Sequence, residues 1–522
     1  MKKTTILVFL LAVSLVHAQT ADTTTAYRIK IESVENSEVM NILDALTNGI
    51  GPRLTNSKKM ADANQWAKSK LESYGLKAEV EPWGDFGNGW DVKSFSAQVT
   101  SPYAFPLMAY PKAWSPGLKG MLKGRVVLVE GTDLASIMKT YDGKLKNAIV
   151  LLGEQVNVEE NFEPLAKRFS DSELLEMANE GLSADGESNW RARYRNSPRF
   201  AAYRQRLKIF SWINSQSPAL IIDGGGGSTR GLNSGIVNVQ GAMTPLVDTS
   251  DVFSRSNPKP WDPNVPKITP QIMVSTEQYN QMVSLVKQGK EVIVECDLQV
   301  SWQNKDTKGY NTIGEWAGSD LRDQIVMVGA HMDSWHAATG ATDNAQGVAV
   351  MTEAVRILKR LGLQPRRTVR VGFWSGEEQG LFGSGGYVQN HLKDSNGTKQ
   401  DFEKFSVYFN LDNGAGQIRG IYLQNNEKAE SYFRSWLEPF RGWNASTLTL
   451  KSTGGSDHQS FDRAGLPGFQ FIQDPIAYGT KTWHTNMDHY DHVIPEDMKR
   501  NAAIMAYFIY MASTVEEMVP RK

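Results

Sequence analysis

The chain has 522 residues, of which 40% are hydrophobic and 22% are charged, and this composition is that of a folded globular protein rather than a disordered one. Its net charge of −1 gives the chain no overall excess of basic residues of the kind that indicates binding to nucleic acid or anionic membranes. The length suffices for an enzyme core with a large insertion, and such a core folds without disulfide or metal staples.

The first 18 residues have the pattern of a secretory signal peptide. Lys2 and Lys3 provide a positive start, residues 6–16 are apolar, and Val16-His-Ala is a small-x-small cleavage site. We therefore expect an exported protein, periplasmic or secreted, whose mature chain begins at Gln19. No later segment is apolar for long enough to span a bilayer, so we expect no transmembrane helix.

Residues 36–80 read as the opening of an α/β domain. Asn36-Ser-Glu can cap a first helix, and Ile50-Gly-Pro-Arg predicts a turn after it. Residues 58–74 predict a second, amphipathic helix, and residues 76–80 a strand.

Residues 106–289 have a different sequence pattern from the segment before them, and this change predicts an inserted domain. Short strands separated by Gly and Pro begin this segment, whereas residues 155–215 are charged and helical in pattern. We expect the charged stretch to be a solvated helical surface, and Gly224–Gly227 to be a flexible turn.

Residue 296 is the only cysteine, so no intrachain disulfide can form. It lies in Glu291-Val-Ile-Val-Glu-Cys, whose alternation predicts a strand. We expect Cys296 to be a small buried side chain rather than a catalytic thiol.

From residue 290 to residue 522 strands alternate with helices. The predicted strands cover 324–330, 368–374 and 405–411, and a helix covers 345–361. This alternation predicts an α/β fold with a mixed, largely parallel sheet sandwiched by helices.

Polar residues gather where these strands end. Seven of the eight histidines lie between His331 and His492. In open α/β sheets, ligands bind outside the carboxyl ends of the strands. The residues that this placement singles out are His331, Asp343, Glu377, Glu378, Asp412 and His484.

This set of side chains predicts a metal site. Histidine, aspartate and glutamate together suit zinc, with cobalt or manganese as alternatives. The adjacent carboxylates of Glu377 and Glu378 would repel each other in a closed site unless cations neutralise them, and one could bind metal while the other acts as a base. Asp333 lies where its carboxylate can brace His331.

These motifs resemble those of the co-catalytic zinc exopeptidases, which include secreted bacterial aminopeptidases, plasma glutamate carboxypeptidase and the glutamate carboxypeptidase/transferrin-receptor group. The matching segments are Gly329-Ala-His-Met-Asp-Ser-Trp, Gly340-Ala-Thr-Asp-Asn-Ala-Gln-Gly, Gly376-Glu-Glu-Gln-Gly-Leu-Phe-Gly-Ser, Asn410-Leu-Asp, Gly455-Ser-Asp-His-Gln-Ser-Phe and His484-Thr-Asn-Met-Asp. The resemblance implies a peptidase domain in two parts, 19–105 and 290–522. The insertion between them, 106–289, would resemble the protease-associated domain of these enzymes.

The resemblance also implies a role for each ligand. Asp343 would bridge two zinc ions. His331 and Asp412 would complete one site, and Glu378 and His484 the other.

Further roles follow from the same resemblance. Glu377 would be the general base of peptide hydrolysis, and Asp333 would orient His331. The peptide bond after Asp343 would be cis. Several relatives have a tyrosine where this chain has Trp483, so the group that holds the oxyanion is open, with Tyr478 and His458 as candidates.

Two other functions are compatible with parts of the pattern. Trp483-His-Thr also resembles glutaminyl cyclases, which would make the chain an acyltransferase with one working zinc. A non-catalytic receptor like the transferrin receptor is a third alternative, although such proteins have lost ligands that this chain retains. Among peptidases, aminopeptidase, dipeptidase and carboxypeptidase are expected in that order. The oligomeric state is open, with a homodimer among the alternatives.

Overall fold

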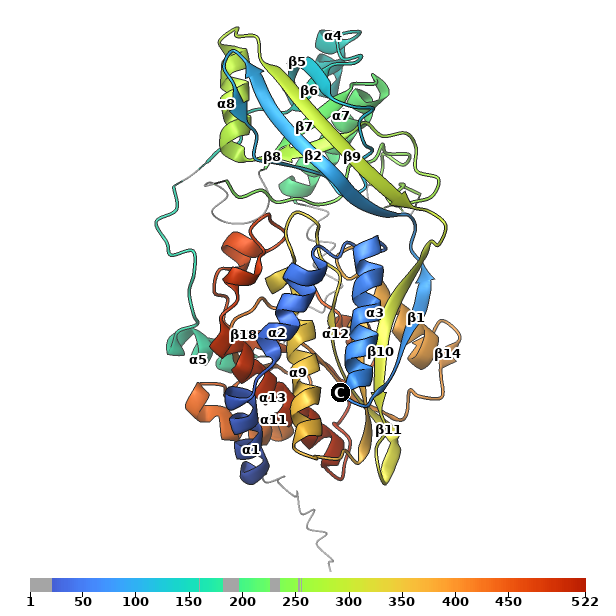
Figure 1. The fold of residues 1–522 in the computed structure, drawn as a ribbon, viewed down its shortest axis with the longest axis vertical. Helices are drawn as coiled ribbons and strands as arrows, with labels where there is room; N and C mark the ends of the chain where they lie inside the picture. The colour runs from blue at the N-terminus through green and yellow to red at the C-terminus, as the bar shows by residue number, and fades with distance from the viewer. Residues whose placement is uncertain (1–20, 159, 182–196, 226–234, 252–253, 255) are drawn as a thin grey trace, which may run out of the picture.

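The computed structural model describes residues 21–158, 160–181, 197–225, 235–251, 254 and 256–522. The predicted signal peptide, part of the charged segment and half of the predicted glycine turn, residues 226 and 227, lie outside these residues. Two eight-stranded sheets form a lower and an upper unit in Figure 1. We call residues 89–303 the second unit and the remainder the first unit. Within the described residues, no helix has the length and apolar character needed to cross a membrane.

The sheet of the first unit is mixed, with four parallel strands at its centre. The order is β1-β10-β12-β11-β15-β18-β16-β17. The strands are β1 (Lys77–Asp85), β10 (Lys308–Trp316), β11 (Leu321–His331), β12 (Arg367–Trp374), β15 (Phe405–Asn410), β16 (Ile418–Tyr422), β17 (Thr447–Thr449) and β18 (Gly468–Gln473). β12, β11, β15 and β18 run parallel, and antiparallel pairs flank them on both sides. This is the largely parallel α/β sheet that the sequence predicted.

Helices cover both faces of this sheet. One face packs against α1 (Thr23–Glu35), α2 (Val39–Asp44), α3 (Lys58–Ser73), α9 (Gln346–Arg360), α11 (Glu430–Leu437) and α13 (Pro495–Thr514). The other packs against α10 (Phe382–Tyr387) and α12 (His458–Ala464). β11 is apolar on both sides because Val326 and Val328 contact the first set, whereas Ile325 and Met327 contact the second.

Short elements complete the first unit. They are the hairpin β13 (Lys393–Asp394) and β14 (Gly397–Thr398), and the short helical turns η1 (Ala45–Ile50), η2 (Ala341–Ala345), η3 (Val388–Leu392), η4 (Glu427–Ala429), η5 (Glu438–Trp443), η6 (Tyr478–Thr482) and η7 (Tyr490–His492).

The second unit has its own sheet, in the order β3-β2-β9-β5-β6-β7-β8-β4. Its strands are β2 (Gly89–Ser101), β3 (Phe105–Pro106), β4 (Ala109–Pro111), β5 (Leu122–Val129), β6 (Ile149–Leu152), β7 (Leu220–Gly224), β8 (Gln271–Val274) and β9 (Ile293–Gln303). Its helices are α4 (Leu134–Tyr141), α5 (Asp171–Asn179), α7 (Pro198–Ser215) and α8 (Thr276–Lys287). Cys296 lies buried in β9, as predicted, and burial raises the pKa of its thiol to about 12.

The second sheet extends beyond the predicted insertion of 106–289. β2 and β9 lie outside those limits, yet they pair with each other along their whole length and join this sheet. The antiparallel ribbon that they form is the connection between the two units in Figure 1. The domain boundaries stay a prediction, and a division near residues 89 and 303 would keep both strands with the second sheet.

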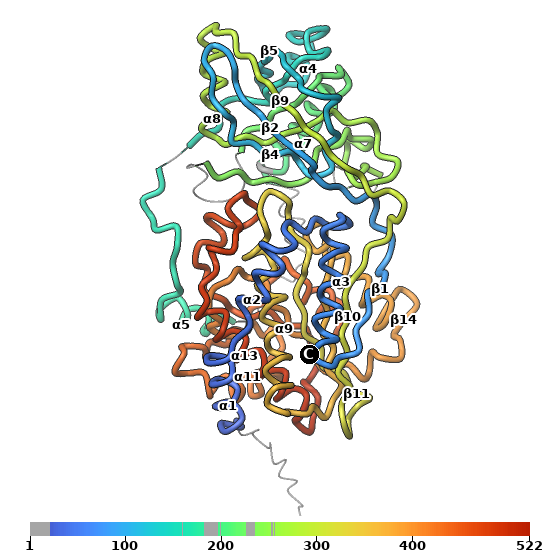
Figure 2. Tube along the Cα trace, in the orientation of Figure 1, coloured from blue at the N-terminus to red at the C-terminus, as the bar shows by residue number. Residues whose placement is uncertain are grey.

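One part of the second unit reaches down along the first. Figure 2 shows the chain leaving the second unit and running to α5, which lies beside the first unit. Arg168 forms ion pairs with Asp474 at 2.8 Å and with Asp497 at 2.9 Å, and both carboxylates are buried. The backbone N–H of Lys167 donates to Ile476 O at 2.9 Å. The two units are therefore joined by this segment as well as by the ribbon.

Phe409 of β15 is the centre of an aromatic core, and its replacement tests the packing of the first unit. Its ring is fully buried and lies 5.5 to 5.7 Å from those of Phe433 and Phe508. Phe409→Ala would leave a cavity that costs about 3–5 kcal/mol of unfolding free energy, measured by urea denaturation. Phe162→Ala is the control, because Phe162 is 93% exposed. A loss below about 1 kcal/mol for Phe409→Ala would contradict this packing.

Candidate metal centre

The five predicted ligands converge at the carboxyl edge of the central parallel strands. His331 is the last residue of β11, and Asp412 follows β15 by two residues. Glu378 lies in the turn after β12. Asp343 lies in η2, where the backbone departs from helical angles immediately before α9. His484 comes from the loop after η6. Parallel strands present their carboxyl ends at one edge, which explains why residues far apart in sequence meet here.

The ligand atoms form two groups of three that share Asp343. In one group, Nε2 of His331 lies 3.2 Å from Oδ1 of Asp343 and 3.4 Å from Oδ1 of Asp412. In the other, Nε2 of His484 lies 3.3 Å from Oδ2 of Asp343 and 2.9 Å from Oε2 of Glu378. The two oxygens of Asp343 therefore face different imidazoles.

The donor set fits cations, because buried ligand atoms lack other partners. His331 Nε2, Asp343 Oδ2, Glu378 Oε1 and Asp412 Oδ1 are buried and have no hydrogen-bond partner among the described residues. A buried carboxylate without a partner carries a large desolvation cost. Accordingly, burial and the nearby Asp343 carboxylate raise the pKa of Glu378 to about 7. Burial likewise raises the pKa of Asp412. Cations between these atoms would remove that cost.

Glu377 lies next to the ligands but belongs to neither of the two ligand groups. Its Oε2 is 4.0 Å from Nε2 of His331, and its side chain lines the same cavity as Asp343 and His484. Burial, together with the carboxylates of Asp412 and Asp457, raises the pKa of Glu377 well above its ordinary value. Glu377 is thus a carboxylate with strong affinity for a proton, beside the two groups of ligands.

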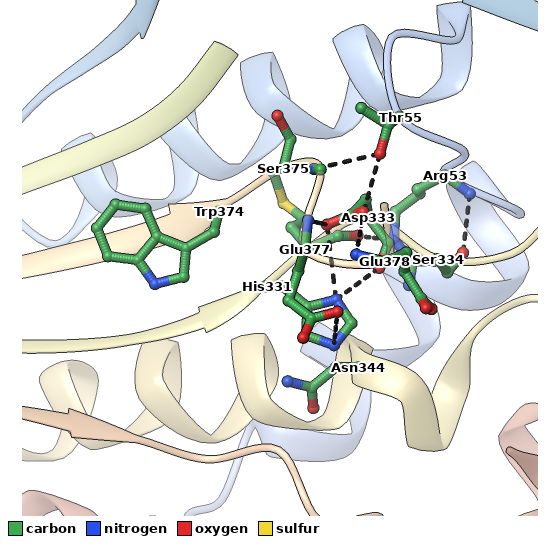
Figure 3. A network of polar contacts seen from close by, with 12 residues as sticks. Arg53, Thr55, His331, Asp333, Ser334, Asn344, Trp374, Ser375, Glu377 and Glu378 are labelled. Atoms are coloured by element: carbon green, nitrogen blue, oxygen red, sulfur yellow. Dashed lines mark hydrogen bonds and ion pairs between the residues drawn. The ribbon is translucent and has the colours of Figure 1, made fainter. Parts of the chain in front are cut away.

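Asp333 organises the loops that carry these residues. Its carboxylate accepts from Thr55 Oγ1 at 2.9 Å and from the backbone N–H groups of Glu378 and Glu377 at 3.3 and 3.4 Å (Figure 3). Nδ1 of His331 lies 3.0 Å from the backbone carbonyl of Asp333 and 3.6 Å from its Oδ1. Asp333 therefore contacts His331 mainly through its main chain, while its side chain holds the Glu377-Glu378 turn.

The loop of Asp343 is held from the other side by Asp488. The Asp488 carboxylate accepts from the backbone N–H groups of Thr342 at 2.6 Å and of Asp343 at 3.0 Å. The peptide bond between Asp343 and Asn344 is cis, as the resemblance implied. The Asn344 side chain donates to Leu411 O at 2.9 Å, which ties this loop to the strand end that carries Asp412.

The three candidate oxyanion residues have different positions. Tyr478 and Trp483 line a cavity of about 980 Å³ together with four of the ligands, Asp343, Glu378, Asp412 and His484. Burial raises the pKa of Tyr478 well above its ordinary value, so its hydroxyl keeps its proton. The Trp483 ring stacks on His484 with centroids 4.0 Å apart. His458 is fully buried in α12, with Nε2 3.0 Å from Thr453 O, and is not among the described residues that line the cavity.

Arg53 is a supporting residue that sequence reasoning recognised only as part of a turn. Its guanidinium is completely buried, which lowers its pKa to about 10. It donates hydrogen bonds to the backbone carbonyls of Leu46, Gly51, Met332, Thr339 and Gly340. Arg53 therefore ties the first turn of the chain to the loop between His331 and Asp343. The signal for this role was only its place after Gly-Pro, because the carbonyls of Met332, Thr339 and Gly340 lie far away in sequence.

Replacement of Arg53 tests whether this loop depends on it. Arg53→Met would leave buried carbonyls without donors, at a cost of about 3–5 kcal/mol of unfolding free energy. Arg53→Lys would not rescue the loss, because lysine lacks the planar fork of donors. The measurement is chemical denaturation of each variant. Arg441→Met, which removes an exposed arginine, should change stability by less than about 0.5 kcal/mol. Equal stability of Arg53→Met and the wild type would exclude this role.

Comparisons of sequence agree with the site. Residues 311–509 match Peptidase family M28. Over 285 residues the chain is 28% identical to carboxypeptidase Q of Mus musculus, covering 54% of this chain and 58% of that protein. It is 30% identical to aminopeptidase YwaD of Bacillus subtilis (strain 168), covering 37% of this chain and 42% of that protein. The matched segments thus span 58% of the first of these curated relatives and 42% of the second.

Comparisons of structure cover most of the chain. A Peptidase M28 precursor from Shewanella amazonensis SB2B superposes with a TM-score of 0.65 at 23% identity, covering 95% of this chain and 98% of that one. A zinc aminopeptidase from Bacillus subtilis, BSAP, gives a TM-score of 0.55 at 18% identity, covering 92% and 95%. These likenesses show the fold. The matched segment leaves out residues 106–289, so the protease-associated part of the resemblance stays a prediction. The resemblance to zinc exopeptidases is confirmed by residues 311–509, which match Peptidase family M28 and contain all five predicted ligands.

Proposed function

We propose that the chain is an exported metallo-exopeptidase that binds two zinc ions and hydrolyses peptides near a free terminus. The observation that carries this proposal is the pair of ligand groups joined by Asp343. His331, Asp343 and Asp412 would hold one ion, and Asp343, Glu378 and His484 the other. Imidazole and carboxylate ligands suit zinc, and cobalt or manganese could replace it.

Bound at these positions, the ions would polarise a peptide carbonyl and lower the pKa of water. The protein supplies the proton transfers. Glu377 would take a proton from the attacking water and return it to the leaving amine. Its position favours these steps, because its side chain lines the same cavity as Asp343 and His484 and lies outside both ligand groups. Asp333 supports this role indirectly, since its carboxylate accepts hydrogen bonds from the backbone N–H groups of Glu377 and Glu378.

The oxyanion partner that we favour is Tyr478. Its hydroxyl stays protonated and is therefore a donor, and its side chain lines the cavity with Glu377 and Asp343. His458 is less suited, because it does not line the cavity in the described part of the chain. Trp483 covers one side of the His484 ring and would position it rather than donate to substrate.

The size of the cavity supports short peptides as substrates. Its volume of about 980 Å³ is that of a pocket for a small ligand rather than of a groove for a folded protein. Its wall is polar away from the ligands, where Gln424, Ser452 and Arg463 contribute. Aminopeptidase, dipeptidase and carboxypeptidase specificities remain in that order of expectation, and the oligomeric state remains open.

Metal analysis of the purified protein together with a peptide panel tests the proposed function. Two zinc ions per chain and cleavage of peptides with a free N-terminus would support an aminopeptidase. Cleavage that requires a free C-terminus would identify a carboxypeptidase. Cyclisation of N-terminal glutamine without hydrolysis would instead identify the glutaminyl cyclase alternative. Absence of any reaction with bound zinc would contradict the proposal.

Glu377→Gln tests the general base directly. The amide keeps the size of the side chain but cannot accept the proton from water, so kcat should fall by about 100- to 10,000-fold. Zinc content should be unchanged, because Glu377 lies outside the two ligand groups. The control is Glu403→Gln, which alters a glutamate whose side chain is 77% exposed. Near-normal turnover in a zinc-loaded Glu377→Gln variant would contradict the role of Glu377 as general base.

A further inference from the structure

The loop that carries His484 is attached to the second unit through its backbone. Val239 N–H donates to His484 O at 3.0 Å, and Asn486 N–H donates to Val237 O at 3.0 Å. Asn238 and Thr485 form an antiparallel bridge between these contacts. The Asn486 side chain also accepts from Val237 N–H at 2.7 Å. The segment that precedes Gln240 therefore acts as a short partner strand for this loop, although it belongs to the second unit.

These contacts hold a residue in an unfavourable conformation. His484 has a φ of +57°, in the left-handed region that non-glycine residues rarely adopt. Such backbone persists where the surrounding structure determines it, and functional sites are where it gathers. For His484, that surrounding structure includes the backbone hydrogen bonds of Val237 and Val239 to its loop. The orientation of the His484 ring thus depends on residues outside the first unit.

The second unit also contacts the ring itself. The Gln240 side-chain amide nitrogen lies 3.1 Å from Nδ1 of His484, on the opposite side of the ring from Asp343 and Glu378. A histidine that binds a cation through Nε2 carries its proton on Nδ1, and therefore requires an acceptor there. Rotation of the amide by 180° presents Oε1 of Gln240 at the same place, since the oxygen and nitrogen of an amide occupy equivalent positions.

The two histidines of the site differ in this respect. His331 meets its acceptor within its own loop, the backbone carbonyl of Asp333 at 3.0 Å. His484 meets its partner about 240 residues away in sequence, in the second unit. Edge-on contact with Trp335, whose ring centroid lies 5.9 Å away, restricts the His484 ring further.

We propose that Gln240 is a positioning residue for His484, and that the second unit thereby sets the affinity of the Glu378–His484 ion. This inference rests on the proposed function in one point, namely that Nε2 of His484 binds a cation. Gln240 itself would touch neither the substrate nor the ion. Its amide oxygen would accept from Nδ1–H, fix the tautomer and the plane of the ring, and so favour Nε2 as a ligand.

Zinc titration of the metal-free full-length protein, with a competing chelator, tests this role. Gln240→Leu should weaken one of the two zinc-binding steps by about 10- to 100-fold and leave the other unchanged. Gln240→Glu keeps an acceptor at the same place and should restore or tighten that step. At saturating zinc, kcat of Gln240→Leu should return toward the wild-type value with little change in KM. Unaltered zinc binding by Gln240→Leu would overturn the proposal.

Two controls separate positioning from folding. Gln288→Leu removes another exposed glutamine of the second unit, one that donates to Ser284 Oγ at 3.1 Å, and it should bind zinc as the wild type does. The thermal unfolding temperature of the metal-free Gln240→Leu variant should equal that of the wild type, because Gln240 is exposed. A lowered unfolding temperature with failure of Gln240→Glu to restore zinc binding would assign Gln240 a structural role only. If the wild type binds zinc but cleaves no peptide, the proposed function fails while the binding result still decides this inference.

Discussion

The site depends on the position of one carboxylate, that of Asp343. Its two oxygens face the two imidazoles at 3.2 and 3.3 Å, so any rotation or shift of this side chain alters both ligand groups together. The backbone around it is not helical, and α9 begins only at the next turn. Asp488 fixes this loop by accepting its N–H groups, and the Asn344 side chain ties it to Leu411. The loop thus has fixed contacts on two sides.

The rest of the first unit holds the other ligand-bearing residues in position around Asp343. His331, the Glu377-Glu378 turn and Asp412 lie at or just after the ends of β11, β12 and β15, and therefore at one edge of the sheet. The hydrophobic clusters on the two faces of the sheet hold these strands in their relative positions. Loops between strand ends and ligands could still vary. Two fully buried polar residues limit this freedom: Asp333 binds the N–H groups of one turn, and Arg53 binds the carbonyls of another. The loops that carry the buried carboxylates are therefore held by hydrogen bonds to their backbone groups. Such support fixes the positions of the side chains that would bind metal.

Much of the fold, and the meeting of the proposed ligands at one sheet edge, could be predicted because both follow local patterns. β11, β12 and β15 read as apolar runs, and the polar residue after each run marks the sheet edge. The supporting residues could not be predicted in the same way. Arg53 makes contacts with carbonyls more than 270 positions away, and a backbone carbonyl leaves no signal in the sequence. β2 and β9 fell outside the expected insertion because an alternating pattern indicates a strand but not its partner, and only their pairing with each other shows which sheet they join.

The two units contribute different groups to the site. Every group that faces the shared Asp343 belongs to the first unit, and this is also where Glu377 lies. The second unit contributes one partner strand and one amide, and both act on His484. Because the ribbon β2–β9 and the Arg168 ion pairs fix the second unit at two separate places, that partner strand has a defined position relative to the sheet edge. Both ligand groups thus consist of residues of the first unit, whereas the proposed Nδ1 partner of His484 comes from the second unit.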